Sequence, residues 1–388
     1  MPDTTIVLID SVLESAAPNR TLPGTELGAR FESCKVEKRR LSGGKSDGVE
    51  VVDLTVGDLK VRLLPTRGMS LWEVVVGEVR FGWKSPVRGP VHPSFVPVSE
   101  PSGLGWLDGF DELLVRCGLE SNGAPEFDEQ TGRLKYPLHG RIGNLPAHHV
   151  SVSTNSETKE ISVQGIVEES RFHFGKLRMT STLTVKVGES RIRIRDQIQN
   201  LSEGAGEFQM LYHTNFGLPL LDGGSQLVVA ADKVVPRNDH AAKGIERWNH
   251  YAAPLPGFEE EVYFLKLRAG ADGRTNALLR NAHGTSGASL LYDVQQLPCF
   301  TVWKNTTSAS DGYVTGLEPG TNFPNPRSYE KEQGRVVGLA AGETKTLDLE
   351  LQFHTNAEQV QAAEKAVANL SDGKTPEVFR TPQAGWCA

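Results

Sequence analysis

Apolar and polar residues alternate along much of the stretch between residues 147 and 205. The pattern is clearest in four segments, 149–153, 160–167, 177–185 and 191–200. A period of two places successive side chains on opposite faces of a β-strand. These segments therefore predict four antiparallel strands with one face buried and the other in water.

Elsewhere the apolar runs are short and are separated by turn-forming residues, since the chain contains 40 glycines and 22 prolines. Gly57-Asp58 and Gly77-Glu78 each separate two such runs, which predicts two β-hairpins. Many of the runs are rich in Val, Ile, Thr and Phe, as strands usually are. The pattern favours an all-β protein with large antiparallel sheets over an α/β protein. A helix is expected only at 357–369 and in short turns such as 106–114.

The composition limits the classes of partner. The chain carries 41 basic and 48 acidic residues, a net charge of -7, and phosphate contacts need clustered Lys and Arg. We therefore expect neither a nucleic acid nor a membrane partner. The four cysteines are widely spaced with no CxxC pair, which suits a reducing compartment and no zinc site. The first residues lack a secretion-signal pattern, and no segment approaches the roughly 18 apolar residues of a membrane span, so a cytoplasmic protein is expected.

Between residues 136 and 146 a histidine, an arginine and an asparagine stand close together. His139, Arg141 and Asn144 are interspersed with two glycines and flanked by prolines. Glycine lets the backbone approach a ligand closely, and proline stiffens a loop, so this segment is a candidate wall of a binding cleft. The alternative is a surface turn, because short motif matches often arise by chance.

Two further segments present polar side chains where a strand ends. An apolar strand from residue 208 delivers His213 and Asn215, and alternation places both on one side of it. A second strand ends in Glu318 before a Pro-Gly pair, with Asn322 close by. Each segment also has a plainer interpretation. His213 could be a core histidine whose hydrogen bonds go to the backbone, and Glu318 could be a carboxylate in an ordinary turn.

Together the three segments supply two histidines and a carboxylate. This set suits a 2-His-1-carboxylate metal site or a general acid and base. The histidines form no HxH or HxxxH pair, which argues against a metal. Planar polar groups beside aromatic rings favour a substrate rich in hydroxyls. Candidate sugar contacts are Arg67, Trp106, Arg141, Asn215, Trp303 and Asn322.

Five motifs, taken in order, resemble those of the galactose mutarotase-like (aldose 1-epimerase) superfamily, and more narrowly a bacterial branch of aldose-1-epimerase-like proteins. The resemblance implies a β-supersandwich, one large antiparallel domain over residues 25–356. An N-terminal extension (1–24) would precede it, and a C-terminal helix and tail (357–388) would follow. The motifs lie at 65–69, 106–113, 137–144, 212–217 and 316–322.

The resemblance also implies an isomerase that interconverts sugar anomers without a cofactor. His139 resembles the histidine that orients the sugar, and His213 the general acid that protonates the ring oxygen. Glu318 is similar to the general base that takes the proton of the anomeric hydroxyl. The family's sugar-gripping aspartate has two candidates here, Asp108 and Asp232.

The chain departs from the family pattern in ways that bear on the substrate. An asparagine follows His213, whereas mutarotases usually place it before the histidine. Arg67 and Arg141 make the expected pocket more cationic than a neutral hexose requires, which favours an acidic or modified sugar. The alternatives are a non-catalytic sugar-binding or sensing protein, a metal-dependent sugar isomerase and a polysaccharide lyase-like relative. The expected partner is a small sugar, and the protein is expected to be a monomer or homodimer.

Overall fold

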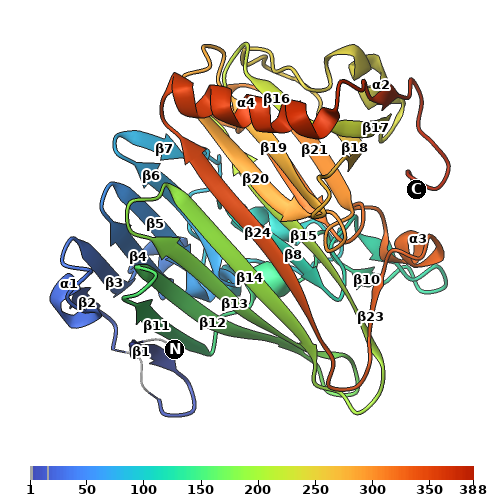
Figure 1. Ribbon diagram of the computed structural model, residues 1–388. Helices are drawn as coiled ribbons and strands as arrows, with labels where there is room; N and C mark the ends of the chain where they lie inside the picture. Colours follow the sequence, from blue (N-terminus) through green and yellow to red (C-terminus); the bar gives the residue numbers. More distant parts are fainter. Residues whose placement is uncertain (1–2, 15–16) are drawn as a thin grey trace.

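The computed structural model describes residues 3–14 and 17–388 and consists mainly of two large, predominantly antiparallel sheets packed against each other (Figure 1). In the part of the chain described, the first sheet has nine strands in the order β1-β11-β12-β13-β14-β24-β20-β19-β16. In that order they span Thr4–Asp10, His149–Asn155, Glu160–Ser170, Lys176–Lys186, Arg191–Asn200, Thr344–His354, Gly287–Asp293, Arg274–Arg280 and Gln226–Val229.

The second sheet has fourteen strands among the described residues. Its order is β2-β3-β4-β5-β6-β8-β15-β22-β21-β18-β17-β25, with β7 on β6 and β23 on β15. In that order they span Arg20–Pro23, Cys34–Arg40, Glu50–Val56, Leu59–Leu64, Ser70–Val76, Leu114–Leu119, Gly206–Phe216, Val314–Gly320, Cys299–Asn305, Glu261–Leu267, Ala231–Pro236 and Glu377–Val378, with β7 at Val79–Phe81 and β23 at Val337–Leu339. A separate pair consists of β9 (Glu126–Phe127) and β10 (Leu134–Tyr136).

The all-β prediction is confirmed. The alternating segments form β11 to β14, and both predicted hairpins are present as β4–β5 and β6–β7. The expected helix near 106–114 is only the 3₁₀ turn η4 (Gly105–Gly109), because β8 begins at Leu114. The other short helices are α1 (Gly24–Leu27), α2 (Asp239–Lys243), α3 (Arg327–Glu332), η1 (Gly44–Ser46), η2 (Pro65–Arg67), η3 (Pro93–Phe95), η5 (Ile142–Asn144), η6 (Ile245–Arg247) and η7 (Ala309–Asp311).

The longest helix, α4 (Ala357–Ser371), covers one end of the nine-stranded sheet (Figure 1). The side chain of Asn356 accepts a hydrogen bond from the backbone of Gln359 and caps the first turn. Ala363 and Val367 pack against Leu278 of β19. No helix in the described ranges is both long enough and apolar enough to cross a membrane. The N-terminal strand β1 pairs with β11; the division into extension, domain and tail stays a prediction.

A buried ion pair joins the two sheets. Arg116 on β8 donates to Asp196 on β14 through Nε (2.5 Å) and Nη2 (3.1 Å). It also donates to Ser181 on β13 and to the carbonyl oxygen of Met69. The hydroxyl of Tyr212 on β15 donates to the same carboxylate at 2.9 Å. Buried charges are tolerated where hydrogen bonds satisfy them in this way.

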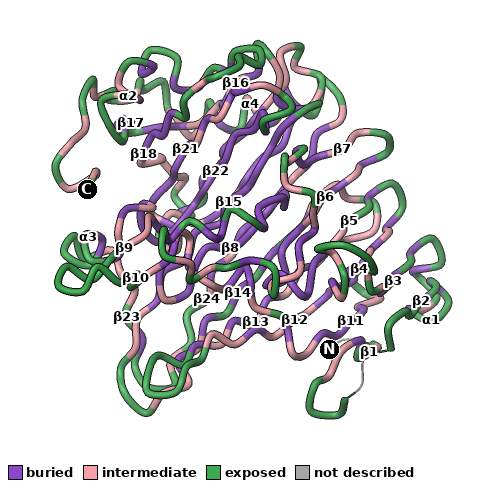
Figure 2. The backbone as a smooth tube through the Cα atoms, turned by 180° about the vertical axis from the view of Figure 1, so that it is seen from behind, coloured by how far each residue is buried: buried purple, intermediate pink, exposed green. Residues whose placement is uncertain are grey.

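Strand β15 lies in the middle of this arrangement. Every residue from Phe208 to Phe216 is buried, and Figure 2 shows β15 with its neighbours β8 and β22 as buried strands. Since Tyr212 points toward the nine-stranded sheet, His213 and Asn215 point to the opposite face of the fourteen-stranded sheet. The candidate site is built on that opposite face.

Candidate active site

His213 and Glu318 meet across two neighbouring strands. The register of β15 with β22 pairs Thr214 with Leu317 and Leu211 with Gly320, so His213 stands opposite Glu318. Nε2 of His213 lies 3.2 Å from Oε1 of Glu318. A side chain at Gly316 would collide with this pair, because its Cβ would lie 2.4 Å from the Glu318 oxygen. The glycine therefore leaves room for the two groups to touch.

Asn215 determines which nitrogen of His213 carries a hydrogen. Its Nδ2 donates to the carbonyl oxygens of Glu112 (3.0 Å) and His213 (3.1 Å). Its Oδ1 therefore faces Nδ1 of His213 at 2.7 Å and accepts a hydrogen bond from it. Nε2 remains free to exchange a proton with Glu318.

Burial shifts both members of the pair toward their neutral forms. Only 2% of Glu318 is exposed, and burial raises the pKa of its carboxyl well above the usual value. Burial, with His139 nearby, lowers the pKa of His213 well below the usual value. We infer that the pair holds one proton between Oε1 and Nε2. Such a pair can donate a proton from one of these two atoms and accept a proton at the other.

His139 completes the cluster from a loop before η5. Its ring lies edge-on to that of His213, with centroids 5.2 Å apart. Its Nδ1 donates to the carbonyl oxygen of Asn122 at 3.0 Å, which leaves Nε2 for a ligand. The backbone φ of 57° is in the left-handed region, uncommon for a residue other than glycine. Burial lowers the pKa of His139 to about 4.

Aromatic rings wall the cluster. The rings of Trp106 and Phe110 are tilted against each other with centroids 4.7 Å apart, and Trp106 meets the His139 ring edge-on at a centroid distance of 4.6 Å. The partly exposed Trp303 lies 5.5 Å from the His213 ring. Aromatic faces over polar groups suit a sugar, whose two faces differ in polarity.

A carboxylate and a cation lie at the exposed edge of the cluster. Trp303 Nε1 donates to Oε2 of Glu260 at 2.6 Å, and Arg237 lies 3.9 Å from the same carboxylate. Arg237 is close enough to depress the pKa of His139, a smaller effect than burial. Neither Glu260 nor Arg237 is among the contacts predicted from the sequence. Glu260 is one of three consecutive glutamates, and only the structure shows which of them reaches Trp303.

The family model described as "Domain of unknown function (DUF4432)" matches residues 46–353. A solved structure from Klebsiella pneumoniae subsp. pneumoniae, provisionally named an aldose 1-epimerase, is 34% identical with a TM-score of 0.94. The match covers 98% of this chain and 99% of that one. The chain belongs to the DUF4432 family and to the galactose mutarotase-like superfamily.

More distant mutarotase-like structures share the fold. A galactose mutarotase-like protein from Clostridium acetobutylicum is 12% identical with a TM-score of 0.56, over 82% of this chain and 98% of that one. Galactose 1-epimerase from Lactobacillus acidophilus NCFM is 14% identical with a TM-score of 0.55, over 84% and 100%. None of the curated proteins matches the chain. The predicted superfamily and β-supersandwich are confirmed.

Arg67 lies inside this mutarotase-like domain and does not face the cluster, contrary to its predicted sugar contact. It is fully buried, and its guanidinium donates to Glu112 at 2.9 Å and to the carbonyl oxygen of Gly109 at 2.9 Å. It also donates to Asn144. Because Gly109 ends η4, Arg67 fixes the turn that carries Trp106. It is a positioning residue.

Asn322 is also a supporting residue in this mutarotase-like domain. It exchanges two side-chain hydrogen bonds with Asn122, at 2.8 and 2.9 Å, and uses its remaining capacity on Thr321 and Phe323. No polar atom of Asn322 is left for a sugar. Because Asn122 accepts the hydrogen bond of His139, Asn322 acts on the cluster indirectly.

Three other predicted contacts lie away from the cluster of this DUF4432 protein. Asp108 is exposed and lines a surface cavity beside residues 41–46. Asp232 is exposed near the start of β17, where Arg268 pairs with it, whereas Arg237 follows the other end of that strand. Arg141 lines a different cavity, described below. The structure thus places Glu260, and neither candidate aspartate, beside the cluster.

The pKa of His139 predicts a pH dependence of stability in this mutarotase-like protein. A histidine with a lowered folded-state pKa binds protons mainly when unfolded, so stability falls as pH drops from about 6.5 toward 4. Between pH 7 and 5 the loss from His139 is on the order of 2 kcal/mol. We expect His139→Gln to remove this part of the loss in urea denaturation.

His354 provides a matched control. Burial lowers its pKa to about 4 as well, and Ser289 on β20 bonds its ring at 2.9 Å. His354→Gln should flatten the same pH dependence without changing any sugar-dependent property. A His139→Gln protein with the wild-type pH slope would contradict the burial of that ring.

Proposed function

We propose that this protein is an aldose 1-epimerase that interconverts sugar anomers by general acid–base catalysis. The supporting observation is the 3.2 Å contact between Nε2 of His213 and Oε1 of Glu318. The ring oxygen and the anomeric hydroxyl of an aldose are bonded to the same carbon. An acid and a base acting on those two oxygens therefore have to lie close together, as these groups do.

The reaction proceeds by opening and closing the sugar ring. Glu318 takes the proton of the anomeric hydroxyl, the carbon–oxygen double bond forms, and the bond to the ring oxygen breaks. The one proton that the pair shares is carried on Nε2 of His213, which leaves Glu318 as a carboxylate, and it passes from Nε2 to that ring oxygen. Rotation about the single bond between the carbonyl carbon and the next carbon of the chain then presents the other face of the carbonyl to the ring oxygen. Closure returns the proton from Glu318 to the new hydroxyl and the ring-oxygen proton to His213, so no cofactor is consumed.

Other groups of the cluster bind the sugar in this proposal. Nε2 of His139 and the carboxylate of Glu260 bond hydroxyls, and Trp303 contacts the apolar face. The predicted sugar contact of Trp106 is replaced by a supporting role, because Trp106 is fully buried and packs against the ring of His139. Among the described residues no group of three or more His, Cys, Asp or Glu side chains is placed to hold a metal ion, and no observation favours the metal-dependent isomerase. A non-catalytic sugar-binding protein remains the alternative, since binding needs the same walls.

The acidic-sugar hypothesis now depends on one residue. Arg67 and Arg141, which motivated it, do not face the cluster, while Arg237 does. We propose that Arg237 contacts a polar or acidic substituent of the sugar. Exchange NMR of the anomeric protons, on a panel of neutral aldoses and uronic acids, tests whether the protein accelerates anomer exchange and whether it prefers an acidic sugar. Binding without faster exchange on any member would support the non-catalytic alternative.

Asn215 offers a test of how His213 is prepared for proton transfer. Replacing it by alanine removes the acceptor at Nδ1, so both neutral tautomers of His213 become accessible. We expect a mixture of tautomers in long-range ¹H–¹⁵N spectra and a loss of exchange rate of about 10–100-fold. A single unchanged tautomer in the variant would show that Asn215 does not orient the ring.

A further inference from the structure

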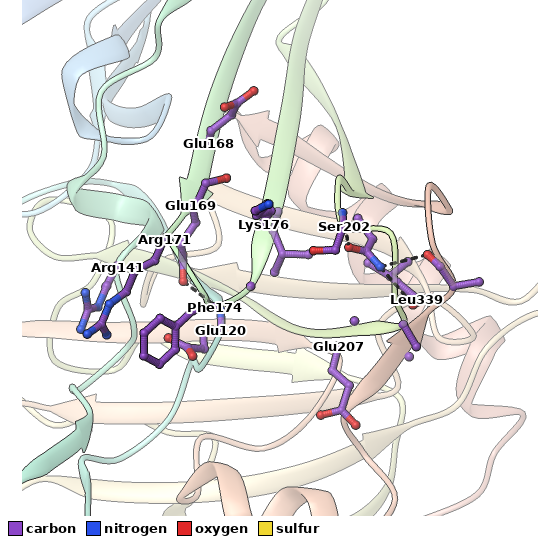
Figure 3. A pocket seen from close by; sticks show the side chains of 18 of the residues that line it. Glu120, Arg141, Glu168, Glu169, Arg171, Phe174, Lys176, Ser202, Glu207 and Leu339 are labelled. Atoms are coloured by element: carbon purple, nitrogen blue, oxygen red, sulfur yellow. Dashed lines mark hydrogen bonds between the residues drawn. The ribbon is translucent and has the colours of Figure 1, made fainter.

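A large cavity lies apart from the His213–Glu318 cluster. Its volume is about 870 Å³, within the range of small-molecule sites. It opens where the β12–β13 hairpin, the β14–β15 connection and β23 come together, at the end of the sandwich. Figure 3 shows Glu168, Glu169 and Lys176 on the hairpin strands, with Arg141 entering from the segment beside η5. His139, His213 and Glu318 are not part of its lining.

Arg141 brings an unsatisfied cation to this cavity. Among the described residues its guanidinium has no hydrogen bond and no ion pair, and its Nε is buried without a partner. Buried N–H groups without an acceptor are costly, and more so on a charged group. A carboxylate or phosphate satisfies a guanidinium with two parallel hydrogen bonds. Arg141 thus has the geometry of an anion anchor with its partner missing.

Most carboxylates around the cavity are already engaged. Glu168 pairs with Arg178, and Glu207 pairs with Arg327 and Lys331. Glu169 accepts hydrogen bonds from the backbone N–H groups of residues 119 and 120 but forms no ion pair in the described chain, and Arg141 is close enough to influence it. Its charge therefore counts, with that of Glu120, against the free cations.

The remaining charged groups leave an excess of cations. Arg141, Lys176 and Arg171 form no ion pair within the described ranges, and Glu120 is the one lining carboxylate there whose side chain has no partner. Arg171 lies over the ring of Phe174, 4.0 Å from its centroid. The balance of free charge therefore favours an anion.

The rest of the lining includes apolar side chains. Leu145, Leu177 and Leu339 come from the loop after η5, from β13 and from β23, and Phe174 lies at the hairpin tip. Inorganic anions gain nothing from such contacts, whereas an apolar body gains the free energy of leaving water. A ligand that combines an anionic group with an apolar body fits the cavity best.

We propose that this cavity is a second binding site, for an organic anion. Arg141 holds its carboxylate or phosphate group, Lys176 adds charge at the mouth, and the three leucines receive its apolar body. The site is independent of the proposed epimerase activity.

Calorimetric titration of the full chain at constant ionic strength tests the proposal with four probes. Phenyl phosphate is compared with inorganic phosphate, and hexanoate with acetate. Each organic anion is expected to bind at least tenfold more tightly than its inorganic or short counterpart. Arg141→Gln should weaken binding of phenyl phosphate at least tenfold. Arg133→Gln is the control, because Arg133 is exposed, has no ion pair in the described chain and lies outside the lining.

Lys176→Gln is a second variant at an exposed position where folding is not at risk, and about threefold weaker binding is expected. The proposal is overturned if neither organic anion binds, or if Arg133→Gln loses as much affinity as Arg141→Gln. It is also overturned if Lys176→Gln and a folded Arg141→Gln both bind like the wild type. Loss of binding in Arg237→Gln instead would place the anion at the candidate active site and reject the cavity.

Discussion

Replacing Glu318 by glutamine is expected to lower the rate of anomer exchange by about 10²–10⁴-fold, the usual contribution of a general base. Glutamine keeps the shape of the side chain and cannot accept the proton of the anomeric hydroxyl. Folding should not suffer. A buried carboxyl with a raised pKa destabilises the protein above its unfolded pKa, and the amide removes that cost. The measurement is exchange NMR on an active sugar, with the melting temperature recorded in parallel.

Glu73→Gln is the control for this experiment. Glu73 lies on β6 of the same sheet, where it pairs with Arg62 and Arg80, and the exchange rate should stay within about twofold. A folded Glu318→Gln protein with wild-type exchange would remove Glu318 from the mechanism. The pair with His213 would then be structural.

Replacing Arg116 by methionine is expected to destabilise the protein by about 3–5 kcal/mol, the usual cost of removing one partner of a buried ion pair. Asp196 would keep its charge between the sheets with only Tyr212 donating to it. Urea denaturation at pH 7 measures the effect. Melting should also occur at lower temperature.

Arg195→Met is the matched control, one residue away from Asp196 on the same strand. Its pair with Asp348 is exposed, with 63% of the Arg195 side chain open to solvent. Exposed pairs contribute about 1 kcal/mol or less, so the two variants should differ by several kcal/mol. Equal losses in the free energy of unfolding would mean that the buried pair stabilises the protein no more than the exposed pair does.

The sequence predicts the fold best where a strand buries only one face. β12, β13 and β14 show this directly, because every second residue along them is buried. β15 does not follow this pattern. It is buried on both faces, so burial alone does not distinguish its sides, and only the partners of Tyr212 and His213 show which side meets the other sheet.

The candidate site was predictable where a side chain lies within a strand, as His213 and Glu318 do, and unpredictable where a long side chain lies in a turn or loop. His213 and Glu318 have little freedom, so strand register brings them together. Arg67 reaches Glu112, 45 residues away in sequence, and no local pattern encodes that partner. Arg141 lies two residues from His139 and yet lines a different cavity. The backbone turn at His139, with its positive φ, separates the directions of the two side chains.

The double burial of β15 has a consequence for engineering. The side chains on one face of β15, such as Tyr212, hold the two sheets together, and those on the other face, such as His213, belong to the candidate active site. A substitution on either face is therefore expected to affect both packing and proton transfer. Libraries aimed at new sugar preferences should therefore leave this strand untouched. They should vary Arg237, Glu260 and Trp303 instead, because these side chains are at least partly exposed to solvent and lie beside the buried cluster.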